Sequence, residues 1–246
     1  MSNGVNYEAL VKLPSKGLLY EGELEEIGLR GMTTKEEKIL YASQSGDVFQ
    51  KILNSCVVSP ENFDASELIA ADEIFLILQL RMVTYGPEYK VSVTCPHCGK
   101  EETYTINLGD FKIDYLPDDF VEPIEIVLPK SGKKLGVKLL RNSDVENVNK
   151  FSRKHSKQYG LDYKEVRYTA NMAKYIRTID GKDVTFAEAR EFVDNMSSLD
   201  SAKFWTVINK IVVGVDSTVY ETCPHCGEEF EFSMPMTSEF FRPVIE

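Results

Sequence analysis

The sequence has no long hydrophobic stretch and no recognisable export signal. Its most apolar run, around Ile74–Leu80, contains Gln79 and is followed by Arg81, whereas a membrane-spanning helix needs about 20 apolar residues. The N-terminal segment MSNGVNYEAL lacks both a basic start and an apolar core, so no secretory signal is expected. We therefore expect a soluble protein without a membrane span, made in a cytoplasm.

Positive charge is also scarce. The 246 residues include 28 basic and 39 acidic side chains, which gives a net charge of −11. An acidic protein repels phosphate groups, so the overall charge disfavours binding to nucleic acid or to anionic membranes. Apolar residues make up 43% of the chain, which is enough to build a hydrophobic core and predicts a folded protein rather than a disordered one.

The common catalytic motifs are missing as well. The sequence contains no GxxxxGK[ST] or GxGxxG loop and no GxSxG or HExxH motif. Of its three histidines only His155 stands outside the cysteine motifs described below, on a lysine-rich predicted helix. Asp72 and Glu73 are adjacent, and adjacent helical residues diverge by about 100°, so they cannot act as a catalytic pair. We predict no enzymatic activity and no small-molecule substrate.

The sequence does contain two nearly identical cysteine motifs, CPHCG at residues 95–99 and again at residues 223–227. Alternating β-type segments flank both motifs, so each is predicted to form the turn of a β-hairpin, with its glycine admitting a positive φ. Two such turns supply four thiolates, which is the closed tetrahedral ligand set of structural zinc sites. We predict one structural Zn²⁺ per chain, held by Cys95, Cys98, Cys223 and Cys226.

Two alternatives for these four cysteines stay open: two redox-active pairs, or reduced thiols without a metal. A thioredoxin-like pair needs a helix N-terminus at its first sulfur, and the β-type flanks disfavour it, so a thiol–disulfide oxidoreductase is the weaker alternative. His97 and His225 are predicted to point away from the metal. Four thiolates leave no open position for a substrate, which predicts a structural metal rather than a catalytic one. The fifth cysteine, Cys56, is predicted to lie in the hydrophobic core.

The spacing of the motifs predicts the domain organisation. Residues 99–222 separate them, whereas paired C-x-x-C motifs of a zinc site are typically about 15–20 residues apart. A folded segment is therefore predicted to be inserted between the two halves of one zinc ribbon. We predict an N-terminal α-rich region with the first hairpin (1–107), an inserted α+β domain (123–213), and the second hairpin with the C-terminal tail (214–246). The predicted fold class is α+β.

Helix signals recur along the chain. Thr33 with Glu36 and Thr34 with Glu37 form capping boxes that begin a helix. The strongest helical pattern contains Asp72 and Arg81, which form either buried polar contacts or part of a solvent-exposed edge; the sequence favours the edge. Predicted helices cover about 34–43, 47–57, 64–86, 144–157, 163–176, 185–196 and 199–213, and a hairpin joins 124–128 to 135–140.

Charge and aromatic residues are unevenly placed. Residues 129–167 carry a net charge of +7, which leaves −18 for the rest. This stretch is a solvated helix surface, a docking surface for an acidic protein, or the footprint of a nucleic-acid-associated zinc-ribbon protein. The C-terminal segment SEFFRPVIE is too apolar for a free tail, so we expect it to dock either on a partner or on its own chain.

Four segments, taken in order, resemble one known family. They are LPSKGLLY (Leu13–Tyr20), LRGMTTKEEKIL (Leu29–Leu40), the helix with D-x-x-F-L-x-x-x-x-R-x-x-T-Y-G (Asp72–Gly86) and the first CPHCG (Cys95–Gly99). They are similar to the baseplate hub proteins of T-even-like contractile-tailed bacteriophages, over about the first hundred residues. The resemblance implies a non-enzymatic structural or assembly protein of the hub, with other baseplate hub and tail proteins as partners. It also implies a location in the virion tail baseplate, or in the host cytoplasm during assembly, and is compatible with an oligomer within the baseplate.

Overall fold

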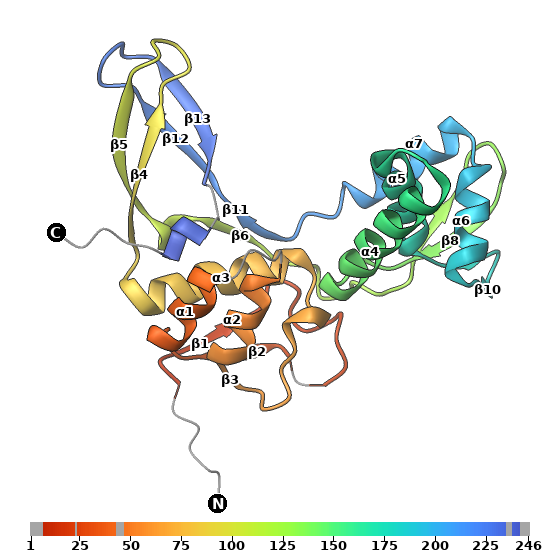
Figure 1. Cartoon of the computed structure of the whole chain (residues 1–246), viewed down its shortest axis with the longest axis horizontal. Coiled ribbons are helices and arrows are strands. Elements are labelled where there is room, and N and C mark those ends of the chain that lie inside the picture. Colours follow the sequence, from red (N-terminus) through yellow and green to blue (C-terminus); the bar gives the residue numbers. More distant parts are fainter. Residues whose placement is uncertain (1–6, 23, 43–46, 235–237, 242–246) are drawn as a thin grey trace, which may run out of the picture.

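The computed structural model describes residues 7–22, 24–42, 47–234 and 238–241 (Figure 1). Helices and small antiparallel sheets mix along these residues, which confirms the predicted α+β class. Figure 1 shows an N-terminal body, a pair of long hairpins standing on it, and a separate lobe to one side. No helix within the described ranges is long and apolar enough to cross a membrane.

The N-terminal body packs helices against a three-stranded sheet of order β1-β2-β3. Its helix α3 is buried around most of its circumference, as its apolar sequence predicts. Cys56 is fully buried at the end of α2, as predicted, and burial raises the pKa of its thiol to about 12. The elements are β1 (Ala9–Lys12), β2 (Glu26–Leu29), α1 (Thr34–Ala42), α2 (Val48–Cys56), β3 (Val57–Ser59), the 3₁₀ turn η1 (Ala65–Glu67) and α3 (Ala70–Tyr85).

The single helix predicted from about residue 64 to 86 is two elements. Asp64 caps only η1, where its side chain accepts a hydrogen bond of 2.9 Å from the Ser66 amide. The chain is extended at Leu68 and Ile69 before α3 begins. This interruption has a partner, because the Asn142 amide donates to the Leu68 carbonyl at 2.8 Å. The inserted lobe thus contacts the body at the extended residues between η1 and α3.

Asp72 and Arg81 are both buried, so the predicted solvent-exposed edge is wrong. Asp72 is fully buried and accepts hydrogen bonds from the Ser15 amide (3.0 Å) and the Tyr20 hydroxyl (2.5 Å). Burial raises the pKa of its carboxyl, and these two hydrogen bonds act in the opposite direction. Arg81 is 2% exposed and donates to the Phe240 carbonyl at 3.0 Å. Each charged group is therefore satisfied by a segment distant in sequence.

The two CPHCG motifs form the turns of two antiparallel hairpins, as predicted. The first joins β4 (Glu88–Thr94) to β5 (Glu101–Asn107), and the second joins β12 (Thr218–Thr222) to β13 (Glu229–Ser233). The hairpins stand side by side above α3 (Figure 1). A short 3₁₀ turn, η2 (Leu108–Asp110), follows the first hairpin.

The two connections to the inserted lobe pair with each other, a feature that the sequence analysis missed. β6 (Lys112–Asp114) and β11 (Gly214–Asp216) form a two-stranded antiparallel neck. Gly214 has a φ of +109°, and a Cβ there would lie 2.9 Å from the Cβ of Ala71 on α3. Glycine is needed at this position because the neck lies against the helix with no room for a side chain.

The lobe has its own hydrophobic core and a four-stranded antiparallel sheet of order β10-β9-β8-β7. Its first helix begins at Asn142 with Arg141 as the N-cap, two residues before the predicted start at about residue 144. Its last helix ends at Ile208, before the predicted residue 213. The elements are β7 (Ile124–Val127), β8 (Lys134–Val137), α4 (Asn142–Tyr159), α5 (Tyr163–Tyr175), β9 (Ile176–Ile179), β10 (Lys182–Asp183), α6 (Phe186–Asp194) and α7 (Ser198–Ile208).

The described part of the C-terminal tail docks on the N-terminal body of its own chain. Phe240 and Phe241, in the 3₁₀ turn η3 (Ser238–Phe241), are buried in the same core as α3. Their rings pack against Tyr89 and Phe49, with centroids 5.1 and 6.0 Å apart. Of the two docking modes expected for these aromatic residues, the structure shows the one on the same chain. Residues 242–246 lie outside the described residues.

Candidate metal centre

The two cysteine turns repeat the same backbone geometry. In each, the amide of the first cysteine donates to the carbonyl five residues later, at 2.9 Å for Cys95 and 3.0 Å for Cys223. The glycines that end the turns have φ values of +71° (Gly99) and +77° (Gly227). A Cβ on either glycine would meet nothing within 4 Å, so glycine is required by the backbone angle rather than by lack of space.

The structure brings the four predicted ligand residues together. The sulfurs of Cys95, Cys98, Cys223 and Cys226 all lie within 4.8 Å of one another. The Cys95–Cys226 and Cys98–Cys223 sulfurs, each pair spanning both hairpins, are 3.8 and 3.7 Å apart. A disulfide requires about 2.05 Å, so these sulfurs are not bonded to each other. Four clustered thiols from two turns are able to bind one metal ion.

Neither histidine of the motifs belongs to this cluster. His225 Nε2 lies 3.4 Å from a carboxylate oxygen of Glu102 on β5. Among the residues that the structure describes, the cluster contains cysteine donors alone. It is half-enclosed, because Cys95 and Cys223 are buried whereas Cys98 and Cys226 are exposed.

The local electrostatics favour a thiolate at one position. Burial opposes ionisation of Cys223, but hydrogen bonds from the backbone amides of His225 and Cys226 outweigh it and lower the pKa of the Cys223 thiol to about 6. Thiolates are the metal-binding form of cysteine. In the same turn a hydrogen bond from the Glu228 backbone amide lowers the pKa of Cys226, but burial and the other three cysteines outweigh it and raise that pKa to about 12, so within this turn the thiolate is favoured at Cys223 alone.

Aromatic side chains pack next to the two buried cysteines of the cluster. Phe230 on β13 is buried beside Cys95 and Cys223. The ring of Tyr104 on β5 lies edge-on to it, with centroids 6.0 Å apart, and Phe232 lies 6.4 Å from Tyr104. The two hairpins therefore contact each other through an apolar face as well as through the sulfurs.

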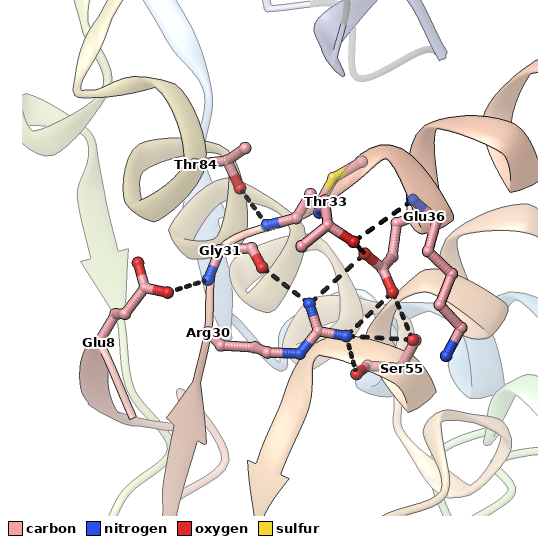
Figure 2. A network of polar contacts seen from close by, with 9 residues as sticks. Glu8, Arg30, Gly31, Thr33, Glu36, Ser55 and Thr84 are labelled. Atoms are coloured by element: carbon pink, nitrogen blue, oxygen red, sulfur yellow. Dashed lines mark hydrogen bonds and ion pairs between the residues drawn. The ribbon is translucent and has the colours of Figure 1, made fainter. Parts of the chain in front are cut away.

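A polar network that the sequence analysis only partly found fixes the segment Leu29–Leu40 (Figure 2). Glu36 is fully buried and pairs with Arg30 at 2.9 Å. Ser55 donates to the same carboxylate at 2.6 Å, and the amide of Thr33 donates at 2.8 Å. The second of these is one of the two hydrogen bonds of the first predicted capping box; the Thr33 hydroxyl accepts from the Lys35 amide instead of the Glu36 amide. Burial alone would raise the pKa of Glu36, but the hydrogen bonds to its carboxylate hold it well below its ordinary value.

The same segment is tied to the end of α3. The Met32 amide donates to the Thr84 hydroxyl at 3.1 Å, and the Gly31 amide donates to Glu8 at 3.1 Å (Figure 2). Tyr20, from the first of the four segments, binds Asp72 in the third. The first three segments thus meet around α3, where they hold the fold together.

The basic stretch 129–167 is partly neutralised within the lobe. Lys133 pairs with Asp180 at 2.5 Å, and Lys150 pairs with Glu146 at 2.6 Å. The buried Asp144 faces Lys138 at 3.9 Å, together with Lys174 and Arg177 from outside the stretch. Asp180 lies outside the stretch, so its pairing reduces the positive charge that a phosphate backbone would meet, whereas Glu146 and Asp144 are already counted in the +7.

A cluster of four cysteines without a further ligand residue is the donor set of the structural class of metal centre, in which a metal joins parts of a protein. Residues 5–242 of the chain match the family model described as T4 bacteriophage base plate protein. The chain belongs to this family and is a phage baseplate protein, which confirms the resemblance at the level of the baseplate. A search of curated proteins found no match to the chain, and neither did a search of solved structures.

Proposed function

We propose that this chain is a non-enzymatic structural or assembly protein of the baseplate hub, and that Cys95, Cys98, Cys223 and Cys226 hold one Zn²⁺. It acts through contacts with other hub and tail proteins, in the virion tail or in the host cytoplasm during assembly. The family match over residues 5–242 supports the baseplate role, and the four clustered thiols support the metal.

The observation that carries the zinc proposal is the spacing of the sulfurs. Zn–S bonds of about 2.3 Å at tetrahedral angles place the sulfurs about 3.8 Å apart. Two of the sulfur pairs that span the hairpins, Cys95–Cys226 and Cys98–Cys223, are 3.8 and 3.7 Å apart. Zinc would supply a closed four-coordinate link between the hairpins, with no position for a substrate.

We also propose that 123–213 is a domain in its own right, inserted between two parts, 1–107 and 214–246, that form one body. Its buried core is separate from that of the N-terminal body, which includes Val219 and Met234 from the end of the chain. The paired strands β6 and β11 place both connections at one point.

Metal analysis of the purified chain tests the site. We expect one zinc per chain, and the loss of that zinc in a Cys95→Ser or Cys223→Ser variant. No zinc, two zinc ions per chain, or full zinc in both variants would contradict the shared site. Mass spectrometry of purified phage particles separates a virion component, present in a fixed copy number, from an assembly factor that is absent.

A further inference from the structure

The outer face of the second hairpin combines negative charge with an exposed aromatic ring. Tyr220 is 75% exposed and lies directly opposite Glu231, while Thr222 lies opposite Glu229. Residues 217–234 contain four glutamates and no lysine or arginine. A shallow hollow of about 460 Å³ runs over this surface, which we call the hairpin acidic face. It is lined by Tyr220, Glu221, Thr222, Glu229, Phe230 and Glu231.

A complementary surface lies on α4 in the lobe. Lys150, Arg153, Lys154 and Lys157 are exposed and spaced so that they share one side of the helix. Only Lys150 is paired, with Glu146 on the same helix. Within the described ranges the other three form no ion pair. We call this surface the α4 basic face.

The two faces do not meet within one chain. α4 lies in the lobe, whereas β12 and β13 stand above the N-terminal body on the far side of the neck (Figure 1). The lobe is also held in place, because Arg141 donates to the Leu19 carbonyl at 2.6 Å and the Asn142 side chain donates to the Ala65 carbonyl at 2.9 Å. The hairpin acidic face and the α4 basic face can therefore each bind another molecule.

We propose that the hairpin acidic face of one copy of this chain binds the α4 basic face of a second copy. The spacings match: Glu229 and Glu231 are two residues apart on a strand, or about 6.8 Å. Lys154 and Lys157 are three residues apart on a helix, with about 5–6 Å between their Cβ atoms. Tyr220 offers its ring to Arg153, which adds a cation–π contact to the ion pairs.

The geometry of this contact has consequences for assembly. It joins different surfaces on the two copies, so a single contact leaves one acidic and one basic face unoccupied. Repeated contacts of this kind build a closed assembly, such as a reciprocal pair or a ring, if the rotation between copies closes, and an open filament if it does not. Because the contact is mainly ionic, it weakens as salt shortens the Debye length from about 10 Å at 0.1 M to about 3 Å at 1 M. The inference goes beyond the hub role and does not depend on it.

Two charge-reversal variants of the full chain test the proposal by sedimentation under reducing conditions. The first is Glu229→Lys with Glu231→Lys, and the second is Lys154→Glu with Lys157→Glu. Wild-type protein should exceed its monomer mass of 27.9 kDa at low salt and return to it at high salt. Each variant alone should weaken self-association by about tenfold or more. An equal mixture of the two should associate again, because each then supplies the charge that the other lacks.

Matched controls reverse exposed charges elsewhere, with Glu125→Lys and Lys182→Glu, and should associate as wild type does. Retained zinc content and unchanged Trp205 emission show that the test variants are folded. A wild-type chain that stays monomeric at low salt would overturn the proposal. So would variants that still self-associate, or an equal mixture that remains monomeric.

Discussion

Replacing Cys223 with serine should release the paired hairpins while the inserted lobe stays folded. The change removes one of four clustered sulfurs, and metal-binding free energy in such a site contributes directly to folding. The hairpins would then be held together only by the apolar face around Tyr104, Phe230 and Phe232. We expect faster amide exchange over 88–107 and 217–234, with little change in the lobe.

The size of the effect depends on the neck. Without the neck, the metal would close a loop of more than a hundred residues, which corresponds to about 4.7 kcal/mol of chain entropy. Because β6 and β11 already pair, only residues 99–111 and 217–222 lie in the loop that a bound metal would close. A loop of that size corresponds to about 3 kcal/mol. The loss of stability in the Cys223→Ser variant should therefore be confined to the hairpins.

Two probes separate the parts of the molecule. Hydrogen exchange reports on the hairpins, and the single tryptophan, Trp205 on α7, reports on the lobe through its contacts with Tyr175 and Phe204. The control is Cys56→Ala, which removes a cysteine outside the cluster and should keep the metal. If Trp205 emission shifts together with hairpin exchange in Cys223→Ser, the neck does not isolate the two parts and the reasoning is wrong.

Three further predictions concern the body and the charge. Glu36→Ala should lower the unfolding free energy by about 1–3 kcal/mol in denaturant titrations at neutral pH. Because the folded state depresses the pKa of Glu36, the stability that this carboxylate contributes is present above about pH 4.5 and is lost as the pH falls further. Phe240→Ala should cost about 3–5 kcal/mol, since the ring is fully buried, and an unchanged melting temperature would contradict the docking of the tail. Gel-shift assays at physiological salt should show no duplex DNA binding, because net charge is −11 and several basic residues are paired; submicromolar, salt-dependent binding would revive the nucleic-acid alternative.

Local signals in the sequence were sufficient for the hairpins and most helices. Alternating residues and a glycine determine the turns at Cys95–Gly99 and 223–227, and the capping pair Thr33 and Glu36 determines the start of α1. These features depend on residues a few positions apart. The clustering of the four cysteines also followed, because a repeated motif with one chemistry indicates one shared site.

Long-range contacts explain what the sequence analysis missed. Asp72 is satisfied by Ser15, and Arg81 by the carbonyl of Phe240, 159 residues away. No local pattern predicts such partners, so the polar residues looked like a solvent-exposed edge. The break before α3 depends on Asn142 in the same way, and the short strands of the neck exist only because each pairs with the other.

The neck also determines how force would pass between the lobe and the body. Both of its strands run between the same two parts, so a pull on the lobe is carried as tension by two covalent backbones. A two-stranded ribbon is only marginally stable by itself, so contacts outside the neck help to set the angle of the lobe. These include the Arg141 guanidinium on the Leu19 carbonyl, the Asn142 amide on the Leu68 carbonyl and the Asn142 side chain on the Ala65 carbonyl. A pull on the lobe is therefore carried by the neck, whereas a twist of the lobe is resisted by the few polar contacts that Arg141 and Asn142 make with the body.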